Sequence, residues 1–445
     1  MKLTLRLVTT ALLFGGSTLF AQVPGMMTMQ QASVPQGTDL GANTTVTAPG
    51  IALGNRVKLR GFVDFRYDNT DIEYVDHDKR FRTGVDLDLL IDFSPVTSEI
   101  HLNAASGSGV SLEQAFIRYS FNRDFNLSMG RQLTVMGMES DESTGLYQVS
   151  HGYAADVAIE DGIQHGPAAL SSFIGLGGLS SISSMVVADL EASPTLLQNA
   201  STLAGLGATT AAREAAVPQI GSIQLPQFRR NYVDGVRANF NNGRFGLTVG
   251  LHNGLWGDDN LNDSNIGIDI AAALMIVPGL EWQIGYGYES NDNWDESVAS
   301  YNKWVHAHNS AITGLNPGTT LMSLPTADHI SQFNTFLTYK TGGLTLGFEY
   351  DLWDIYIVDM WNIMLMANYQ FNNVFGLTFR YSHEDFEIDA FNSKGDTDRF
   401  TLSPSFSITD NLTILLEYSH VSLDSANIGG SKDADEVYAE TIFNF

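Results

Sequence analysis

Charged side chains recur at alternate positions in several segments of the sequence, and they are the residues best suited to act on a solute. Lys58 and Arg60 are two residues apart, as are Asp86 and Asp88. Alternate residues of an extended strand share one face, so each pair would project from one side of a sheet. The same parity selects the candidate lumen-facing set: Lys58, Arg60, Arg66, Arg118, Arg131, Arg237, Arg380, Asp86, Asp88, Glu349, Glu417 and Glu440. Further acids share this parity: Asp64, Asp92, Glu281 and Asp351.

Two interpretations of these charges stay open. Arginines on early strands and acids on distant strands would create a field across a water-filled pore, which orients dipolar solutes and filters ions. Alternatively, each arginine pairs with a neighbouring acid and stiffens the wall. Acids outnumber bases at the inward positions and in the acidic segments between strands, so we expect a preference for cations.

Other candidate sites are weaker. The run Asp258–Asp263 offers oxygen ligands for a hard cation such as calcium, but it lacks the glycine and the glutamate of a helix-loop-helix calcium site. A solvated loop is the better interpretation. His306 and His308 are two residues apart, and no nucleophile or metalloprotease spacing accompanies them. The chain has no cysteine, which excludes thiolate sites and disulfides. We therefore expect no enzyme activity, no metal site and no cofactor.

The composition favours β structure and argues against a nucleic-acid partner. The 445 residues carry a net charge of −27, whereas binding to phosphates needs a basic surface. Charged residues make up only 16% of the chain and aromatic residues 11%, a balance that favours strands over helices. Beyond the N-terminus, no apolar run reaches the roughly 20 residues of a membrane-spanning helix.

The N-terminus is predicted to be an export signal. A short positive region precedes the apolar run Leu7–Phe20, and Ala21 offers a small residue for cleavage. This arrangement is typical of a secretory signal peptide, which we assign to residues 1–21. Residues 22–56 are polar and lack any period, so we expect a mostly extended periplasmic lead-in.

From Val57 onwards, apolar and polar residues alternate with a period of two. In Phe245–Leu251, for example, apolar residues alternate with glycine and threonine. Short Asn/Gly or Pro/Gly connections alternate with longer ones rich in Asp, Asn and Ser, which is the layout of an outer-membrane β-barrel. We predict an all-β fold over residues 57–445. It is a closed antiparallel transmembrane β-barrel of about 16 strands, with short periplasmic turns and long extracellular loops, because an open edge would leave backbone groups unpaired in lipid.

A soluble two-sheet sandwich is the main alternative fold. Against it, aromatic residues recur near strand ends, as expected for interfacial girdles. The last strand alternates and ends on Phe445, with Phe443 two residues before. This end resembles the C-terminal assembly signal of bacterial outer-membrane barrels, so both residues are candidate contacts of the barrel assembly machinery. We also expect Glu440 of the last strand to meet Arg60 of the first at the closed seam.

Several segments resemble the OmpL-like β-barrel porin family. They are Leu59–Asp64, Leu112–Tyr119, Gly130–Glu139, Gly235–Arg237 and Asn253–Trp256. The resemblance implies an outer-membrane porin, a water-filled channel for passive diffusion of ions and small hydrophilic solutes, and it supplies no catalytic residues. The expected partners are outer-membrane lipid and these solutes. The oligomeric state stays open, a homotrimer included.

The sequence departs from that family in a large loop insertion at about residues 134–230. Ala, Gly, Ser and Leu dominate its middle, and strict alternation is lost. Three placements are open. The insertion could fold into the lumen and narrow the pore, or lie outside as a cap or subunit contact. It could also supply a further hairpin, which would make 18 strands.

Two other functions remain as alternatives. An outer-membrane transporter for hydrophobic solutes would need an N-terminal hatch, for which residues 22–55 are too polar. A structural or adhesive barrel would need no conducting lumen. Ion-selectivity measurements on single channels separate these functions from a porin.

Overall fold

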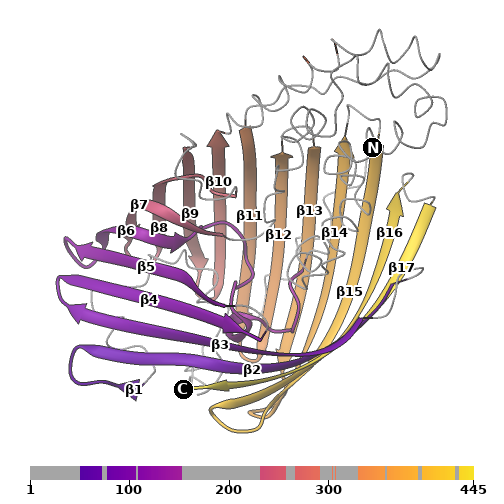
Figure 1. Ribbon diagram of the computed structural model, residues 1–445, viewed down its shortest axis with the longest axis horizontal. Helices are drawn as coiled ribbons and strands as arrows, with labels where there is room; N and C mark the ends of the chain where they lie inside the picture. The colour runs from indigo at the N-terminus through magenta and orange to yellow at the C-terminus, as the bar shows by residue number, and fades with distance from the viewer. Residues whose placement is uncertain are drawn as a thin grey trace, which may run out of the picture.

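Long antiparallel strands follow one another along the chain, as the period of two predicts (Figure 1). The computed structural model describes residues 51–72, 78–106, 109–152, 231–256, 266–290, 303, 306, 329–355, 358–388, 393–425 and 430–445. Its strands are β1 (Ile51–Ala52), β2 (Val57–Ile72), β3 (Asp78–Phe93), β4 (Val96–Ala105), β5 (Val110–Ser120), β6 (Phe125–Leu133), β7 (Tyr232–Asn241), β8 (Phe245–His252), β9 (Gly267–Val277), β10 (Leu280–Ser290), β11 (His329–Thr341), β12 (Leu344–Ile355), β13 (Val358–Gln370), β14 (Phe375–Ile388), β15 (Ser393–Ser407), β16 (Leu412–Ser425) and β17 (Gly430–Asn444). The predicted signal peptide, most of the lead-in and the acidic run 258–263 lie outside the described residues.

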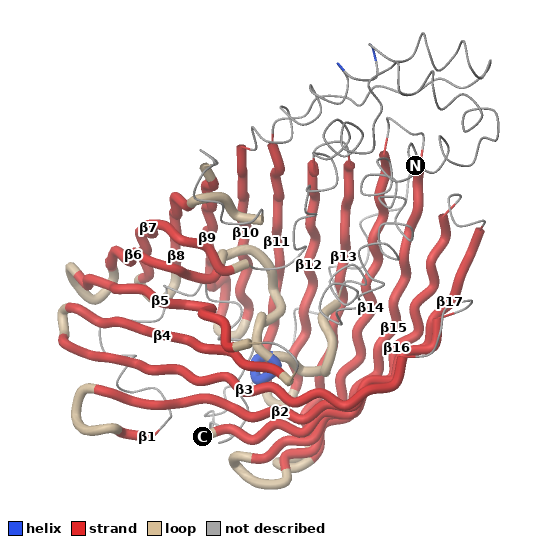
Figure 2. The backbone as a smooth tube through the Cα atoms, viewed as in Figure 1, coloured by secondary structure: helices blue, strands red, loops and turns tan. Residues whose placement is uncertain are grey.

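The strands β2 to β17 close into one barrel of 16 strands (Figure 2). Each strand pairs with the next, and β17 pairs back with β2, so the predicted closed antiparallel barrel is confirmed. The two-residue β1 adds to the side of β2. Strands β6 and β7, which flank the insertion, pair directly from Phe125 to Leu133. The wall is therefore continuous there, which confirms the predicted 16 strands and excludes the alternative of 18.

The seam between the first and last strands is staggered. Phe445 and Gly61 exchange two backbone hydrogen bonds of 3.1 and 3.0 Å, so β2 extends beyond the end of β17. Glu440 consequently lies opposite Arg66, while Arg60 pairs with an aspartate of β3. The predicted contact between Arg60 and Glu440 is wrong because closing a barrel of tilted strands requires a shift in register, which strand ends alone do not reveal.

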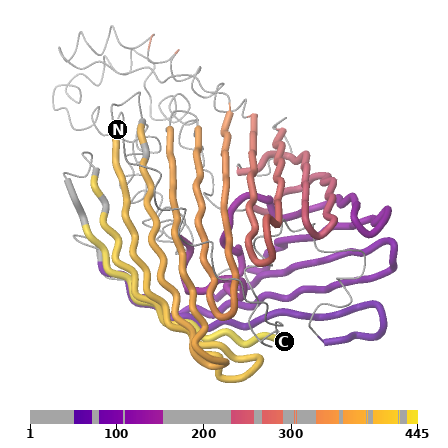
Figure 3. Tube along the Cα trace, turned by 180° about the vertical axis from the view of Figure 1, so that it is seen from behind, coloured from indigo at the N-terminus to yellow at the C-terminus, as the bar shows by residue number. Residues whose placement is uncertain are grey.

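The short turns gather at one end of the barrel, and three of them share one construction (Figure 3). In each, the Oδ1 atom of an asparagine accepts hydrogen bonds from the backbone N–H groups two and three residues later. The donor–acceptor distances are 2.8–3.0 Å at Asn122, Asn242 and Asn372. The side chain thus replaces a backbone acceptor, which explains why asparagine marks these connections.

The two faces of the wall have opposite polarity. Phe65 and Phe400 on the outside are each 48% exposed, whereas Arg237 and Thr248 on the inside are 1% and 0% exposed. A soluble sandwich buries its apolar faces, so this pattern excludes that alternative. Aromatic rings meet near both ends of the outer face, as in Tyr369–Phe371 and Tyr381–Phe400, which is typical of a barrel in lipid. No helix among the described residues is long and apolar enough to cross a membrane.

After β6 the chain turns into the barrel. Residues 134–152, called the inner segment below, include the 3-10 helix η1 (Ser143–Gly145). In Figure 2 this short helix lies between the front and rear walls. The segment forms hydrogen bonds with side chains on the inner face of β10, β12 and β16. This part of the insertion therefore has the inward placement, and residues 153–230 lie outside the described residues.

Candidate functional site

Two buried carboxylates hold the backbone of the inner segment against the wall. Glu349 of β12 accepts a hydrogen bond from the Met138 N–H at 2.8 Å. Glu417 of β16 accepts hydrogen bonds from the N–H groups of Val149 and Ser150 at 2.7 and 2.9 Å. Both carboxylates are only 2% exposed. These buried hydrogen bonds fix the segment at two separate places on the wall.

Arginines of β14 and β15 complete this attachment. Arg380 lies 2.9 Å from the Glu139 carboxylate and donates to the Ser150 carbonyl oxygen at 2.6 Å. Arg380 and Arg399 also lie 3.9 and 3.6 Å from the Glu417 carboxylate. Both arginines are buried, and the charges of the segment and the wall compensate each other. Sequence analysis misses Arg399, although it shares the inward parity of its strand.

An apolar patch on the inner wall receives the inner segment. Met138 packs with Phe336, Met364 and Met366, and all four are 3% exposed or less. Gly347 leaves room for this contact, because a Cβ atom there would lie 2.8 Å from the Met138 Sδ. Two methionines at successive inward positions of β13 are the sequence signal for the patch, since a wall that faced only water would carry polar residues.

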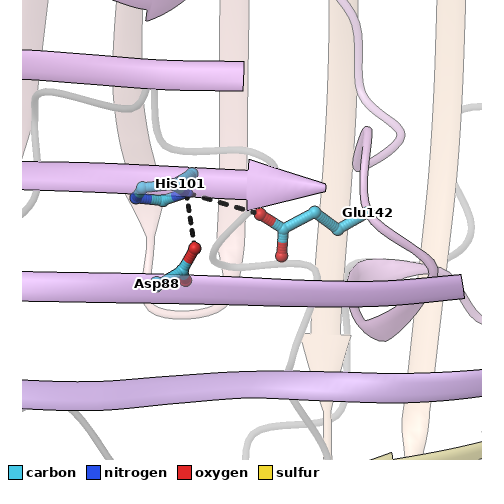
Figure 4. Close-up of side chains that lie close together, drawn as sticks. All are labelled: Asp88, His101 and Glu142. Carbon is cyan, nitrogen blue, oxygen red and sulfur yellow. Dashed lines mark ion pairs between the residues drawn. The ribbon is translucent and has the colours of Figure 1, made fainter. Parts of the chain in front are cut away.

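The other edge of the inner segment approaches the wall formed by β2 to β5. Arg60 pairs with Asp88 at 2.6 Å, and the Nδ1 atom of His101 lies 2.9 Å from the same carboxylate. Figure 4 shows Asp88 and His101 on neighbouring strands and Glu142 reaching toward them from the segment. The distance from the Glu142 carboxylate to the His101 Nδ1 is 3.9 Å. The inner segment therefore contacts the wall on both sides of the lumen.

A β-bulge adds one more acid to this part of the wall. The register of β4 and β5 shifts, so that Glu113, between Leu112 and Gln114, has no cross-strand partner. Bulges redirect side chains in this way, and the carboxyl groups of Glu113 and Asp86 lie within hydrogen-bonding reach of each other. Sequence analysis misses Glu113 because the bulge breaks the period of two.

Negative charge dominates the region between the inner segment and β2–β5. Its carboxylates are Asp86, Asp88, Glu99, Glu113, Asp141 and Glu142. The basic groups that act on them are Arg60, His101 and Arg118. Burial raises the pKa of the Glu142 carboxyl, and the nearby charge of Asp88 raises it further. The region therefore contains more acidic than basic groups.

Comparison with known proteins identifies one matching family. Residues 228–445 match the model of a family described as putative beta-barrel porin-2, OmpL-like. This match agrees with the resemblance of the shorter segments to OmpL-like porins, and it extends that resemblance over the second part of the barrel. A comparison of the porin with curated proteins finds no match.

Solved outer-membrane structures share the fold of the porin. Salmonella typhi OmpF, in complex with daunomycin, aligns with a TM-score of 0.51 at 9% identity, covering 87% of this chain and 97% of that one. Pseudomonas putida OprB aligns with a TM-score of 0.51 at 11% identity, covering 88% and 94%. The outer membrane channel DcaP of Acinetobacter baumannii has a TM-score of 0.50 at 10% identity, with 89% and 99% covered. At these identities, the likeness concerns the fold alone.

The porin is a bacterial outer-membrane protein. The family whose model it matches is one of β-barrel porins, and its apolar outer face suits contact with outer-membrane lipid. The predicted localisation is therefore confirmed. In this setting the short turns are periplasmic and the long connections extracellular, as is usual for such barrels.

Most of the other predicted lumen residues are engaged with neighbours on the porin wall. The ion pairs are Arg66–Asp68 at 2.5 Å, Arg118–Glu99 at 3.7 Å and Arg237–Asp269 at 3.3 Å. Glu440 is 1% exposed and faces inward opposite Arg66. Lys58 lies opposite the buried Leu90 near the periplasmic end. Much of the inward charge thus pairs along the wall, as the stiffening interpretation expects.

Arg131 does not belong to the lumen-facing set of the porin. It lies opposite Asp234 and pairs with that residue at 3.4 Å. Ser128 takes the inner face of β6, because its cross-strand partners are the inward Arg118 and Arg237. Arg131 lies three positions after Ser128, and strand residues an odd number of positions apart point to opposite faces. Arg131 is therefore on the outer face, and the prediction that it faces the lumen is wrong. The polar run at the end of β6 has no alternation from which the parity could be read.

Two histidines of the porin form repeated pairs on its outer face. His383 and His420 lie 3.0 and 2.9 Å from Asp398 and Asp435 of the neighbouring strands. In each pair the same aspartate also accepts a hydrogen bond from a tyrosine two residues before the histidine. These pairs lie near the extracellular end and outside the lumen.

Proposed function

We propose that this porin is a diffusion channel whose passage is restricted by the inner segment and whose acidic wall favours cations. The observation that carries the proposal is the position of residues 134–152, which are bound to β12–β16 on one side and approach β3–β4 on the other. Solutes crossing the barrel must pass beside this segment. The route is polar, which suits ions and small hydrophilic solutes rather than an enzymatic role.

Charge in this passage supports the cation preference. The carboxylates of Asp86, Asp88, Glu113 and Glu142 lie together, and Arg60 and His101 are already engaged with Asp88. His101 also acts on Glu113, and His101 and Arg60 act on Glu142, so two basic groups face four carboxylates in this region. In a confined lumen, such charge raises the local cation concentration.

The selectivity prediction concerns two aspartates of β3. Replacing Asp86→Asn and Asp88→Asn together should shift the reversal potential under a potassium chloride gradient toward anions, with a several-fold fall in the cation-to-anion permeability ratio. The change removes two negative charges and leaves Arg60 without its carboxylate partner. The measurement is a planar-bilayer recording at low salt, because mobile ions at high salt weaken the effect of fixed charge on selectivity.

The matched control is Asp435→Asn, since Asp435 carries the same charge on the outer face. Its reversal potential should equal that of the unmodified porin. Anion preference in the unmodified porin at low salt would overturn the proposal, and absence of any conductance would favour the structural or adhesive alternative. A hydrophobic-solute transporter would instead conduct poorly and release a bound apolar ligand.

We also propose that residues 1–21 direct export and that Phe443 and Phe445 bind the assembly machinery. Support comes from the end of the chain, where Phe443 is 47% exposed and Phe445 pairs through its backbone with Gly61. Deleting Phe445 removes both the terminal ring and the last two hydrogen bonds of the seam. A homotrimer stays a prediction.

Deleting Phe445 should therefore lower the amount of heat-modifiable barrel in the outer membrane. The measurement compares outer-membrane fractions with equal expression. Ile408→Ala, at an exposed periplasmic turn residue that does not contact the seam, is the control and should assemble normally. Equal membrane levels of the deletion variant would refute the role of the terminal residue.

A further inference from the structure

Three side chains on the outer face of the porin lie close enough together to share one metal ion. They are His383 of β14 and Asp396 and Asp398 of β15, whose ligand atoms all lie within 4.8 Å of one another. All three are half-buried and alternate with buried residues that face the lumen, so they lie outside the barrel near its extracellular end. The sequence gives no sign of this cluster, because the strand ladder brings together residues 15 positions apart.

Hydrogen bonds already orient two of these side chains. The Oδ1 atom of Asp398 accepts a hydrogen bond from the Tyr381 hydroxyl at 2.6 Å, and it lies 3.0 Å from the Nδ1 atom of His383. Contacts of this kind hold metal ligands in the required orientation. The carboxylate of Asp396 has no hydrogen-bond or ion-pair partner among the described residues, so it is the ligand most open to an incoming cation.

The strand register adds negative charge around Asp396. This residue lies directly opposite Asp385 of β14 on one side and Asp424 of β16 on the other. Like charges at directly opposed positions destabilise a sheet. Lys394, the lysine on this face of β15, pairs with Glu387 of β14. A cation bound at Asp396 would therefore relieve the repulsion among the three opposed aspartates.

The ligand set suits Zn²⁺ better than Ca²⁺. One imidazole nitrogen and two carboxylate oxygens are ligands that Zn²⁺ takes, whereas Ca²⁺ prefers about six to eight oxygen atoms. Four ligands at about 2.0–2.2 Å from a tetrahedral Zn²⁺ lie about 3.3–3.6 Å from one another. The 3.0 Å between His383 and Asp398 and the 4.8 Å limit of the cluster bracket this spacing. Small rotations of the side chains would therefore complete the geometry.

We propose that His383, Asp396 and Asp398 form a Zn²⁺ site on the outer face of the porin, with water as the remaining ligand. The ion displaces the proton between His383 and Asp398, which leaves to solvent. It joins β14 to β15 and neutralises Asp396 between its two opposed carboxylates. The inference goes beyond the proposed function, because a site outside the lumen requires neither conduction nor a cation preference.

The neighbouring strands β16 and β17 supply a matched control. The pair of His420 and Asp435 repeats the contact of His383 and Asp398, at 2.9 instead of 3.0 Å. In both pairs the aspartate also accepts a hydrogen bond from a tyrosine. Within the part of the chain that the structure describes, however, no third ligand atom joins the second pair. His420→Ala therefore removes the same chemical group without changing the proposed site.

The experiment is a calorimetric titration of ZnCl₂ into the purified, folded porin, repeated with CaCl₂. We expect Zn²⁺ to bind more tightly than Ca²⁺ by at least about tenfold, because imidazole favours Zn²⁺. His383→Ala and Asp396→Asn should each weaken Zn²⁺ binding by more than about tenfold, since the loss of even an outer partner of a ligand costs about 10–100-fold. His420→Ala should bind Zn²⁺ as the unmodified porin does.

Urea unfolding provides a second measurement on the same four proteins. A ligand that binds only the folded state raises its stability, so excess Zn²⁺ should raise the unfolding midpoint of the unmodified porin and of His420→Ala. The midpoints of His383→Ala and Asp396→Asn should not respond to Zn²⁺. Folding of each variant is checked separately by its heat-modifiable migration.

The outcomes distinguish the site from the proposed function. Equal affinity for Zn²⁺ and Ca²⁺, or equal losses in His383→Ala and His420→Ala, would refute the site and indicate a diffuse acidic surface. Zn²⁺ binding that survives both substitutions in the site would also refute it. A cation-selective porin that does not bind Zn²⁺ would overturn the site alone. An anion-selective porin that binds Zn²⁺ with the predicted losses would support the site and overturn the cation preference.

Discussion

Glu417→Gln is expected to lower the free energy of unfolding by about 3–5 kcal/mol, the usual cost of breaking a buried ion pair from one side. Glu417 accepts hydrogen bonds from the backbone of Val149 and Ser150, and it lies within 4 Å of Arg380 and Arg399. A neutral amide of the same size would leave two buried guanidinium groups short of negative charge. It would also place an N–H group against backbone donors.

Urea unfolding of the porin in lipid vesicles, followed by tryptophan fluorescence, measures this change. The matched control is Glu387→Gln, at a partly exposed carboxylate near the extracellular end that pairs with the exposed Lys394. Exposed ion pairs contribute about 0–1 kcal/mol, so the control should unfold nearly as the unmodified porin does. Equal midpoints for both variants would mean that Glu417 does not hold the inner segment.

Met138→Glu should raise the single-channel conductance several-fold and make the current noisier. Met138 is 0% exposed within the apolar patch, and its backbone N–H is bound to Glu349. A second carboxylate at this point would be unpaired and close to that of Glu349, and burying it would cost several kcal/mol. Moving the inner segment away from the wall relieves that cost and widens the passage.

Planar-bilayer recordings test this effect, with Met138→Leu as the control at the same position. Volume-conserving apolar exchanges usually cost less than about 1.5 kcal/mol, so this variant should keep the conductance of the unmodified porin. If Met138→Glu still inserts and conducts as before, the inner segment does not restrict the flow, and the proposed passage must lie elsewhere in the lumen.

The alternation of side chains predicts the fold well because the pleat of a strand fixes a period of two. Phe245–Leu251 and the last strand reveal both the strands and their lipid-facing side. The Asn122, Asn242 and Asn372 turns are likewise local, since each asparagine bonds to backbone atoms two or three residues away. Local chemistry of this kind is present in the sequence itself.

The candidate site is only partly predictable from the same pattern. Parity identifies Arg380, Glu349 and Glu417 as inward, but not that they bind a segment more than 200 residues earlier in the chain. Glu113 is missed because a bulge shifts it, and Arg131 is misplaced because its neighbours are polar on both sides. Register, stagger and tertiary contacts depend on the closed barrel, and a single sequence does not display them.

The attachment of the inner segment also sets an order of events in folding. Val149 and Glu417 are 268 residues apart in the chain, and Met138 and Glu349 are 211 apart. Contacts of such high sequence separation form late and slowly, since a long loop must close first. The segment that restricts the passage is therefore made early but can take its place only when β16 is part of the wall. A nascent barrel lacking its last strands would have a wide interior, and the restriction appears only as the barrel nears completion.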